Sequence, residues 1–578
     1  MMMNRESPLQ SGNKRLTGNL GYFFIFVLWL TSVAVGQLPR HIVVPHAGVA
    51  CAEINAAQVG VQILQQGGNA MDAIIAVGFA MAVTYPRAGN IGGGGFILYR
   101  DARTGMVAAF DFRETAPAAA RYDMYWRADG TPDPHKSQLG ALAVGVPGTV
   151  SGLALAHKKF ASFSWQRLIQ PAIELARYGF VVDSSLYRSL KNLKERFQQF
   201  PTSYRIFFPN GEPPHPGTLF IQNDLAITLD QIARLGPDAF YTGEIADKIV
   251  KGLKKYGGIL SLRDLQNYRA KQRQPVTFTY RGYTIYSMPP PSSGGLTLQG
   301  ILKTLETFPL QSFEHNGANY IALVSEVEKQ WYAKRNLYLG DPDFVKIPFH
   351  LFSSPEIIHQ MASRIDPQKP VNSRKMPEYT QIRQPEASHT THISIVDARG
   401  NAAAMTYTLN GSYGSFLVAE GTGILLNNEM DDFSTRPGHP NMYGLVQGWA
   451  NAIEPGKRML SSMTPTIVVR DDQLVGILGT PGGSTIITSV LQVLLNKIDF
   501  QMPLSRAVEK GRFHHQWIPD SIAYEKDRFD PDVLQELQRR GFGLMPYTKI
   551  GDIQAIWKTD AGWEISSDPR RSGYPVGY

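Results

Sequence analysis

Thr390 and Thr408 are the residues of this sequence whose type and spacing best suit covalent catalysis. A threonine hydroxyl is a weak nucleophile that needs a base, and no neighbouring residue in the sequence is an obvious one. The α-amine of Thr390, with an ordinary pKa of roughly 7.7 to 8.0, could serve if the chain were cut between His389 and Thr390. The Thr408 hydroxyl would then hold the Thr390 Oγ by a hydrogen bond. The pair therefore predicts an N-terminal nucleophile.

A β-hairpin is expected to bring these two threonines together. Residues 392–396 alternate polar and β-branched side chains, and residues 402–408 are small, apolar or Thr. Between them, the Ala-Arg-Gly sequence at 398–400 fits a three-residue loop with Gly in the left-handed conformation. In the register that this loop sets, Thr390 lies opposite Thr408 with Cβ atoms about 5 Å apart. The alternative is a plain Thr-rich ribbon, because Thr is a good strand former.

Two other stretches could complete a site around the threonines. Gly482 and Gly483 precede an apolar helix expected over 486–496, and free N–H groups at a helix start can bind an oxyanion. Taken alone, a Gly-Gly pair is usually only a turn. The segment 437–457 is a long loop rich in Gly, Pro and Asn, and so long a loop in a compact domain is often a lid.

The elements that position these residues indicate one large domain or two interlocked ones. At 578 residues and 43% hydrophobic, the chain can bury a large core. Two almost uncharged helices are expected over 53–66 and 71–83, the second capped by Asn69, and both should be buried. Strands are expected over 41–44, 107–112, 466–469 and 475–478. The glycine run 92–95 precedes a strand, which favours close backbone approach within a sheet over a phosphate loop.

The chain begins with the features of an export signal. A basic flank precedes an apolar run over 20–30, and small residues follow as far as Gly36, so cleavage is expected near Gln37. Residues 1–36 are therefore interpreted as a signal peptide. The alternative is an uncleaved membrane anchor through residues 20–36, because the apolar run approaches membrane-spanning length.

Composition narrows the class of protein. Cys51 is the only cysteine, so no intrachain disulfide can form, which suits a bacterial envelope better than an animal extracellular space. The formal net charge of +8 is modest and the basic residues are scattered, so nucleic-acid binding is not expected. The sequence has no His-Glu-x-x-His, no paired Cys ligands and no Gly-x-Ser-x-Gly elbow, and His514-His515 suits a structural role better than a ligand pair. We expect neither a metal nor an organic cofactor.

In combination, these motifs resemble those of the γ-glutamyltranspeptidases, a family of exported N-terminal-nucleophile hydrolases, over about residues 41–578. The shared motifs, in family order, are Thr-Thr-His at 390–392, Gly-Asn at 400–401, Thr-Tyr-Thr-Leu-Asn at 406–410, Leu-Asn-Asn-Glu-Met-Asp-Asp-Phe at 426–433, Ser-Ser-Met-Thr-Pro at 461–465 and Pro-Gly-Gly-Ser at 481–484. The resemblance implies an α/β (α+β) fold, a four-layer αββα sandwich made as an inactive precursor that cuts itself between His389 and Thr390. A large subunit of residues 37–389, ending in a flexible linker over 363–389, would stay associated with a small subunit of residues 390–578.

The resemblance also implies how a γ-glutamyl group is held. Arg113 should pair with its α-carboxylate, helped by the hydroxyls of Ser461 and Ser462. The α-ammonium should be held by three residues with side-chain oxygens, Glu429, Asp432 and Asn410. A free amino-acid end offers one anion and one cation, and these residues supply matching charges.

The remaining roles implied by the resemblance concern the reaction itself. The amides of Gly482 and Gly483 should stabilise the tetrahedral oxyanion, and Thr408 should position Thr390. The expected lid matches a loop that covers the glutamyl pocket in the family, with Tyr443 in the place of the covering tyrosine.

The reaction that the resemblance implies is transfer of a γ-glutamyl group. Glutathione or a related compound would acylate Thr390, and water, an amino acid or a dipeptide would accept the group. One alternative is a glutaryl or cephalosporin-type acylase of the same fold, which would not need cation binding by Glu429 and Asp432. Another is a non-catalytic envelope protein, which would fail to cut itself.

Overall fold

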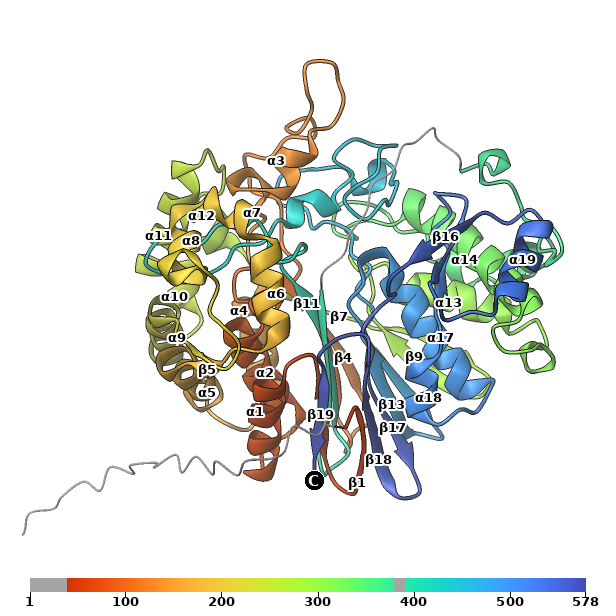
Figure 1. Cartoon of the computed structure of the whole chain (residues 1–578), viewed down its shortest axis with the longest axis horizontal. Helices are drawn as coiled ribbons and strands as arrows, with labels where there is room; N and C mark the ends of the chain where they lie inside the picture. The colour runs from red at the N-terminus through yellow and green to blue at the C-terminus, as the bar shows by residue number, and fades with distance from the viewer. Residues whose placement is uncertain (1–38, 379–389) are drawn as a thin grey trace, which may run out of the picture. The chain divides into compact units, whose positions relative to one another are not determined.

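Two seven-stranded sheets lie face to face between two layers of helices in the computed structural model (Figure 1). The structure describes residues 39–378 and 390–578. The expected signal peptide or anchor and His389 lie outside these residues. Within the two described ranges, no helix is both long and apolar enough to cross a bilayer.

The first sheet is antiparallel throughout and carries the expected hairpin at its centre. Its strands, in spatial order, are β19 (Tyr574–Gly577), β2 (Gly48–Cys51), β10 (Thr391–Val396), β11 (Ala402–Thr408), β3 (Gly94–Arg100), β4 (Val107–Asp111) and β7 (Lys271–Arg273).

The second sheet is also antiparallel and contains the strands expected at 41–44, 466–469 and 475–478, whereas the strand expected at 107–112 is β4 of the first sheet. Its order is β1 (His41–Val44), β18 (Gly562–Ser567), β17 (Gln554–Thr559), β13 (Gln473–Gly479), β12 (Thr466–Arg470), β9 (Tyr283–Ser287) and β8 (Val276–Tyr280).

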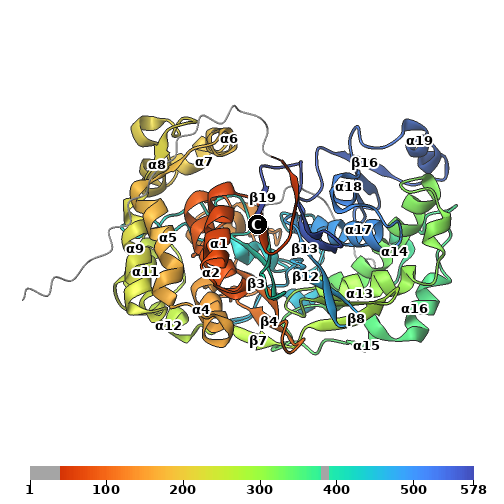
Figure 2. The same ribbon diagram turned by 90° about the horizontal axis from the view of Figure 1, so that it is seen from below.

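Helices cover the outer face of each sheet (Figure 2). Over the first sheet lie α1 (Ile54–Gln65), α2 (Ala70–Thr84) and α4 (Thr149–Phe160), with α5 (Trp165–Tyr178) and α9 (Asn223–Leu235) packed beyond them. Over the second lie α13 (Gly294–Leu305), α14 (Ala318–Tyr338), α17 (Ile486–Ile498) and α18 (Leu504–Glu509). As expected, α1 and α2 are mostly buried, and Asn69 caps α2 in a capping box with Asp72.

Smaller elements complete the chain. The other helices are α3 (Pro134–Gln138), α6 (Ser184–Asn192), α7 (Lys194–Gln198), α8 (Pro201–Phe207), α10 (Asp238–Tyr241), α11 (Gly243–Lys255), α12 (Leu262–Asn267), α15 (His350–Ser353), α16 (Pro355–Ala362) and α19 (Pro531–Arg539). Two minor sheets pair β5 (Phe180–Val181) with β6 (Leu219–Phe220), and β14 (Phe513–His514), β15 (Ile522–Glu525) and β16 (Leu544–Tyr547) with one another.

Successive side chains of a strand point to opposite faces of its sheet, so the strands contribute to separate hydrophobic cores on the two faces. On β3, Phe96 and Leu98 point into the core between the sheets, whereas Ile97 and Tyr99 join the core under the first helix layer. A third core joins the second sheet to α13, α14 and α17. The layer order is therefore helix, sheet, sheet, helix.

The hairpin has the register that the sequence predicts. The Asp397 N–H donates to Asn401 O at 3.1 Å, Gly400 is left-handed with φ 82°, and Thr391 lies opposite Tyr407. Continued by one residue, this register sets Thr390 against Thr408 at the end of β11.

The glycine run allows the close backbone approach that was expected. A Cβ on Gly93 would overlap Thr408 O, and one on Gly95 would lie 2.5 Å from Thr406 O.

The described part of the expected flexible linker forms hydrogen bonds with distant parts of the chain. The Ser373 N–H donates to Asp520 Oδ2 at 2.8 Å, and its Oγ donates to Trp517 O at 2.9 Å. The Val371 N–H donates to Glu326 Oε2 at 3.1 Å. These partners are distant in sequence, so a polar, proline-bearing stretch alone gives no sign of them.

Candidate active site

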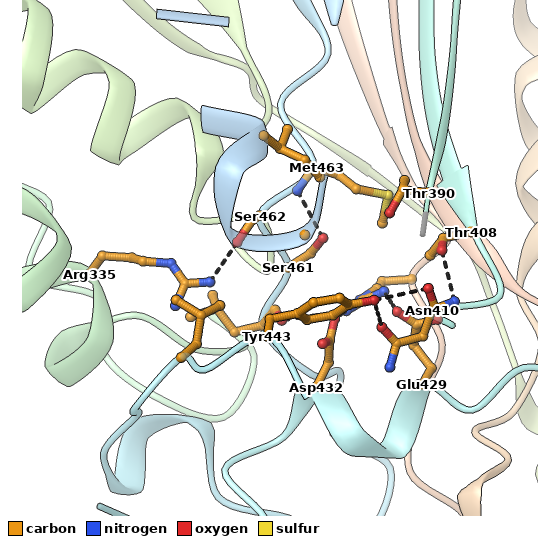
Figure 3. Close-up of a pocket in the computed structure, with 15 residues that line it drawn as sticks. Arg335, Thr390, Thr408, Asn410, Glu429, Asp432, Tyr443, Ser461, Ser462 and Met463 are labelled. Atoms are coloured by element: carbon orange, nitrogen blue, oxygen red, sulfur yellow. Dashed lines mark hydrogen bonds and ion pairs between the residues drawn. The ribbon is translucent and has the colours of Figure 1, made fainter. Parts of the chain in front are cut away.

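A small cavity, partly open to solvent, lies at the end of β11 (Figure 3). Most of the expected site residues line it: Arg113, Thr390, Thr408, Asn410, Glu429, Asp432, Tyr443, Ser461, Ser462 and Gly483. Gly482 does not line the cavity but directly precedes Gly483. Arg335, Leu445, Leu460, Met463 and Ile486 also line it and were not expected.

The two threonines lie beside each other at the cavity wall (Figure 3). Thr390 directly precedes β10 and is 4% exposed, and Thr408 ends β11 and is 2% exposed. The Thr408 Oγ accepts the Asn410 N–H at 2.8 Å, which fixes its side chain. If the chain began at Thr390, the Thr390 hydroxyl would thus lie beside the Thr408 hydroxyl, whose direction is already fixed.

Asn410 turns the chain out of β11 and connects it to the expected lid. Its backbone is left-handed with φ 74°, a conformation that Asn tolerates better than most residues. Its Nδ2 donates to Asn428 O at 3.0 Å. The Tyr443 hydroxyl bonds to Asn410 O at 2.9 Å and to Asn410 Oδ1 (Figure 3).

Gly482 and Gly483 stand where a short 3-10 turn, Gly483–Thr485, leads into α17. Gly483 is left-handed with φ 55°, and a Cβ there would lie 2.6 Å from the Tyr443 ring. Glycine is therefore needed for both its conformation and the space that the ring occupies. N–H groups at the start of a helix lack intrahelical partners, as an oxyanion site requires.

Arg113 is fully buried and forms ion pairs with Glu429 and Asp432. All three residues were expected to bind the same ligand. The Nη1 and Nη2 atoms of Arg113 pair with Glu429 and Asp432, which both lie on the 3-10 turn Glu429–Asp432. Its Nε donates to Met459 O at 3.2 Å. Burial alone would lower the pKa of Arg113, but the two carboxylates outweigh it and raise the pKa.

Glu114 adds a third carboxyl that sequence reasoning missed. Its Oε2 lies 3.6 Å from Arg113 Nη1, and neither of its oxygens has a hydrogen-bond partner among the described residues. Burial raises the pKa of Glu114 to about 8, although Arg113 opposes the shift. At neutral pH this side chain is therefore mostly protonated.

The expected lid is tied to the rest of the molecule through Asp431. The Met442 N–H donates to Asp431 Oδ2 at 2.9 Å, and Ser137 Oγ donates to Asp431 Oδ1 at 2.5 Å. Burial raises the pKa of Asp431 to about 6. The Met442 bond and the Tyr443 hydroxyl attach the expected lid beside the cavity, which Tyr443 and Leu445 line.

Arg335 is the other charged residue that sequence reasoning missed. It lies near the end of α14, a helix of 21 residues that is buried along most of its length. Lysines, glutamates and arginines inside such a helix leave no clear apolar stripe, so the pattern gave no sign that Arg335 faces a cavity.

In the two described ranges, no group of three or more His, Cys, Asp or Glu side chains is arranged to hold a metal ion. His514 and His515 are instead buried among hydrogen-bond partners: His514 Nδ1 lies 2.9 Å from Thr488 Oγ1, and the His515 N–H donates to Glu328 Oε2 at 2.8 Å.

Sequence comparisons relate the chain to one family. A family model described as gamma-glutamyltranspeptidase matches residues 56–578. The chain is 46% identical over 530 residues to the glutathione hydrolase proenzyme of Escherichia coli (strain K12), covering 90% of each protein. It is 44% identical over 533 residues to the glutathione hydrolase proenzyme of Pseudomonas aeruginosa PAO1, covering 91% of this chain and 93% of that one.

Solved structures share the architecture. A cephalosporin acylase from Bacillus halodurans superposes with a TM-score of 0.82 at 26% identity, covering 95% of this chain and 98% of that one. A chain of the Helicobacter pylori gamma-glutamyltranspeptidase is 40% identical with a TM-score of 0.55, covering 56% of this chain and 93% of that one. The expected α+β sandwich is confirmed.

Proposed function

Since the chain belongs to the gamma-glutamyltranspeptidase family, we propose that Thr390 is its nucleophile and that the precursor cuts itself between His389 and Thr390. The activity is that of a γ-glutamyl hydrolase and transferase with autoprocessing. One observation carries the assignment of Thr390. This residue directly precedes β10, lines the cavity and lies against Thr408.

Maturation begins with attack of the Thr390 Oγ on the His389 carbonyl carbon. The acyl group moves from the Thr390 nitrogen to its oxygen, and water then hydrolyses the ester. The products are a carboxylate at His389 and a free α-amine at Thr390. The bond that is cut thus supplies the base that turnover needs.

Turnover repeats this chemistry on the substrate. The Thr390 Oγ attacks the γ-carbonyl carbon while the α-amine takes the hydroxyl proton and passes it to the departing amine. The N–H groups at Gly482 and Gly483 stabilise the tetrahedral oxyanion. Water or an amine then attacks the γ-glutamyl ester and restores the Thr390 hydroxyl.

The charges of the cavity suit the amino-acid end of a γ-glutamyl group. Arg113 takes the α-carboxylate with Ser461 and Ser462, and Glu429 and Asp432 take the α-ammonium with Asn410. Because Arg113 already pairs with both carboxylates, a zwitterionic ligand exchanges one set of ion pairs for another. A ligand with only one charge would leave a buried charge without a partner, which is costly.

The likeness to a cephalosporin acylase supports a second candidate function, removal of a glutaryl side chain. A glutaryl group has the carboxylate of a γ-glutamyl group and lacks its ammonium. Glu429 and Asp432, both buried at the cavity, would then face no cation from the ligand. This arrangement favours the γ-glutamyl group.

The remaining assignments extend from the family. We propose glutathione as a γ-glutamyl donor, amino acids or dipeptides as acceptors, and export to the periplasm or the medium. Residues 37–389 and 390–578 would remain together after the cut, since strands from both pieces form each sheet.

The test is N-terminal sequencing and intact mass of the purified protein, combined with glutamate release from glutathione. Two polypeptides, the smaller beginning at Thr390, together with glutamate release, are expected. Two polypeptides that hydrolyse glutaryl amides but not glutathione would favour the acylase. A single uncut chain without release would refute the proposal.

A further inference from the structure

Arg335 places a guanidinium at the cavity wall, opposite the threonines (Figure 3). We infer that Arg335 is a positioning residue that makes the Ser462 hydroxyl a donor to the α-carboxylate of the substrate and supplies the second positive charge of the binding site. The inference rests on the proposed function and adds to it a residue that determines substrate specificity.

Arg335 is a buried cation that no acidic side chain of the described residues pairs with. Its side chain is 1% exposed, and in residues 39–378 and 390–578 no carboxylate forms an ion pair with it. Burial lowers the pKa of Arg335 to about 10, so it still carries its charge at neutral pH. A buried charge is normally paired, and the cavity beside Arg335 is where a partner could enter.

The hydrogen bonds of Arg335 fix the direction of the Ser462 hydroxyl. Its Nη2 donates to Ser462 Oγ at 2.9 Å, and its Nη1 donates to Asn336 Oδ1 at 2.8 Å. A guanidinium has no acceptor, so Ser462 must accept this bond and direct its own hydrogen elsewhere. Because Ser462 lines the cavity, that hydrogen is available to a ligand carboxylate.

Arg335 also fixes the second serine, through Ser293. Its Nε donates to Ser293 Oγ at 3.0 Å, and the Ser293 Oγ and N–H donate to Ser461 O at 2.7 and 2.8 Å. Ser293 ends the Pro-rich turn that opens α13. The turn thus connects one guanidinium to both serines of the expected carboxylate site.

Arg335 adds a second guanidinium to the cavity that holds Arg113. Glu429 and Asp432 already pair with Arg113, whereas Arg335 forms no ion pair with a side chain of the described residues. A ligand carboxylate that enters the cavity can therefore approach the positive charge of Arg335 without breaking an existing ion pair.

The test compares three competitive ligands that differ only in their charged end. L-Glutamine carries both charges, glutaric acid monoamide only the carboxylate, and 4-aminobutyramide only the ammonium. Inhibition constants are measured against a chromogenic γ-glutamyl anilide with processed enzyme. Arg335→Gln should weaken L-glutamine and the monoamide roughly ten- to hundredfold, as expected for a lost hydrogen-bonded charge, and change 4-aminobutyramide by less than about twofold.

Three further variants separate positioning from general damage. Lys334→Gln removes a positive charge one residue away on α14, where the side chain instead faces Glu378 at 3.6 Å, and should leave the ligand ratios unchanged. Ser462→Ala combined with Arg335→Gln should cost less than the sum of the two changes, because one acts through the other. If Arg335→Gln does not fold, Arg335→Lys, which keeps the charge but not the bonded pair of donors, must still weaken the monoamide more than 4-aminobutyramide.

Equal weakening of all three ligands, or full additivity with Ser462→Ala, would overturn the inference and leave the proposed function standing. If the unchanged enzyme binds 4-aminobutyramide as well as it binds L-glutamine, the assigned carboxylate site itself is wrong, whatever Arg335 does.

Discussion

At the scale of single residues, the proposed chemistry depends on Thr390 starting a chain. Thr390→Ala removes the hydroxyl and should leave an uncut precursor whose γ-glutamyl hydrolysis falls by more than about 10³-fold. Thr408→Ala should slow both the cut and turnover, since only a positioning hydroxyl is lost. Intact mass and glutamate release measure the two steps separately. A Thr390→Ala protein that is cut normally would contradict the mechanism.

His392, two residues along from Thr390, should make stability depend on pH. It is fully buried, with Nδ1 2.7 Å from Thr406 Oγ1 and Nε2 3.1 Å from Ser394 Oγ. Burial lowers the pKa of His392 from 6.5 to about 3. Between these values the unfolded chain binds the extra proton, so the stabilisation is complete above pH 6.5 and is lost as the pH falls.

We therefore expect replacing His392 to flatten the pH dependence of unfolding. In the uncut Thr390→Ala protein, His392→Gln should reduce the loss of unfolding free energy between pH 6 and 4 by about 1.4 kcal/mol per pH unit. Urea unfolding at several pH values measures this slope. His135→Gln, at an exposed position, should keep the parent slope. Parallel curves for His392→Gln and its parent would show that His392 is not the titrating group.

Sequence reasoning reached most residues of the cavity but not their pairing. Thr390 and Thr408 followed from a loop that fixes register, and Gly483 from a glycine pair before a helix. Arg335 was missed because it is defined by a contact with Ser462, which is distant in the sequence. Glu114 directly follows Arg113, but the sequence does not show that its carboxyl is buried beside that guanidinium. The direct pairing of Arg113 with Glu429 and Asp432 was also not expected, because sequence shows which charges are present and not which of them meet.

At the scale of elements, the start of α17 and the lid constrain each other at Gly483. An Ala there would adopt a left-handed backbone that costs about 1–2 kcal/mol and would place its Cβ 2.6 Å from the Tyr443 ring. Gly483→Ala should therefore lower kcat roughly a hundredfold, comparable to loss of one oxyanion donor. Steady-state hydrolysis of a γ-glutamyl anilide provides the measurement.

Gly257→Ala is the matched control for this change. Gly257 is also left-handed, with φ 76°, but a Cβ there would meet nothing within 4 Å. It should lose stability without losing activity. Adding Tyr443→Ala to Gly483→Ala should recover the part of kcat that the ring contact removed; no recovery would mean that backbone strain alone is responsible.

Helices and strands whose ends are marked by capping residues or glycines could be predicted from the sequence. Contacts between the sheets and the helix layers could not. Asn69 and the glycines after α1 placed two helices closely, and the strands expected at 466–469 and 475–478 match β12 and β13. The two sheets' strand order could not be read locally, since β2 and β10 are neighbours separated by more than 300 residues. The hydrogen bonds of Ser373 to Asp520 and Trp517 could not be read locally for the same reason.

At the scale of the whole molecule, each sheet contains strands from both sides of the proposed cut, and strands from the two sides pair directly. β10 lies between β2 and β11, and β11 pairs with β3, while β12 and β18 pair with β9 and β1. Separating residues 37–389 from residues 390–578 would therefore break both sheets and all three cores.

We expect the cut protein to behave as one folding unit. It should elute from size exclusion as a single species at nanomolar concentration and unfold in urea in one transition that releases both polypeptides together. Size exclusion and intrinsic fluorescence measure these properties, with the uncut Thr390→Ala protein as the control. Elution of a free small polypeptide without denaturant would contradict the prediction.

The mixing of strands from both sides of the proposed cut also bears on biogenesis. The β10–β11 hairpin by itself sets Thr390 against Thr408, but the cavity around them also needs Arg113 from before the proposed cut and Ser462 from after it. On the proposed mechanism, a nascent or misfolded chain has no assembled cavity and stays in one piece. Self-cleavage would thus act as a record of completed folding, and the fraction of cut chains in a preparation would report how much of it reached the native state.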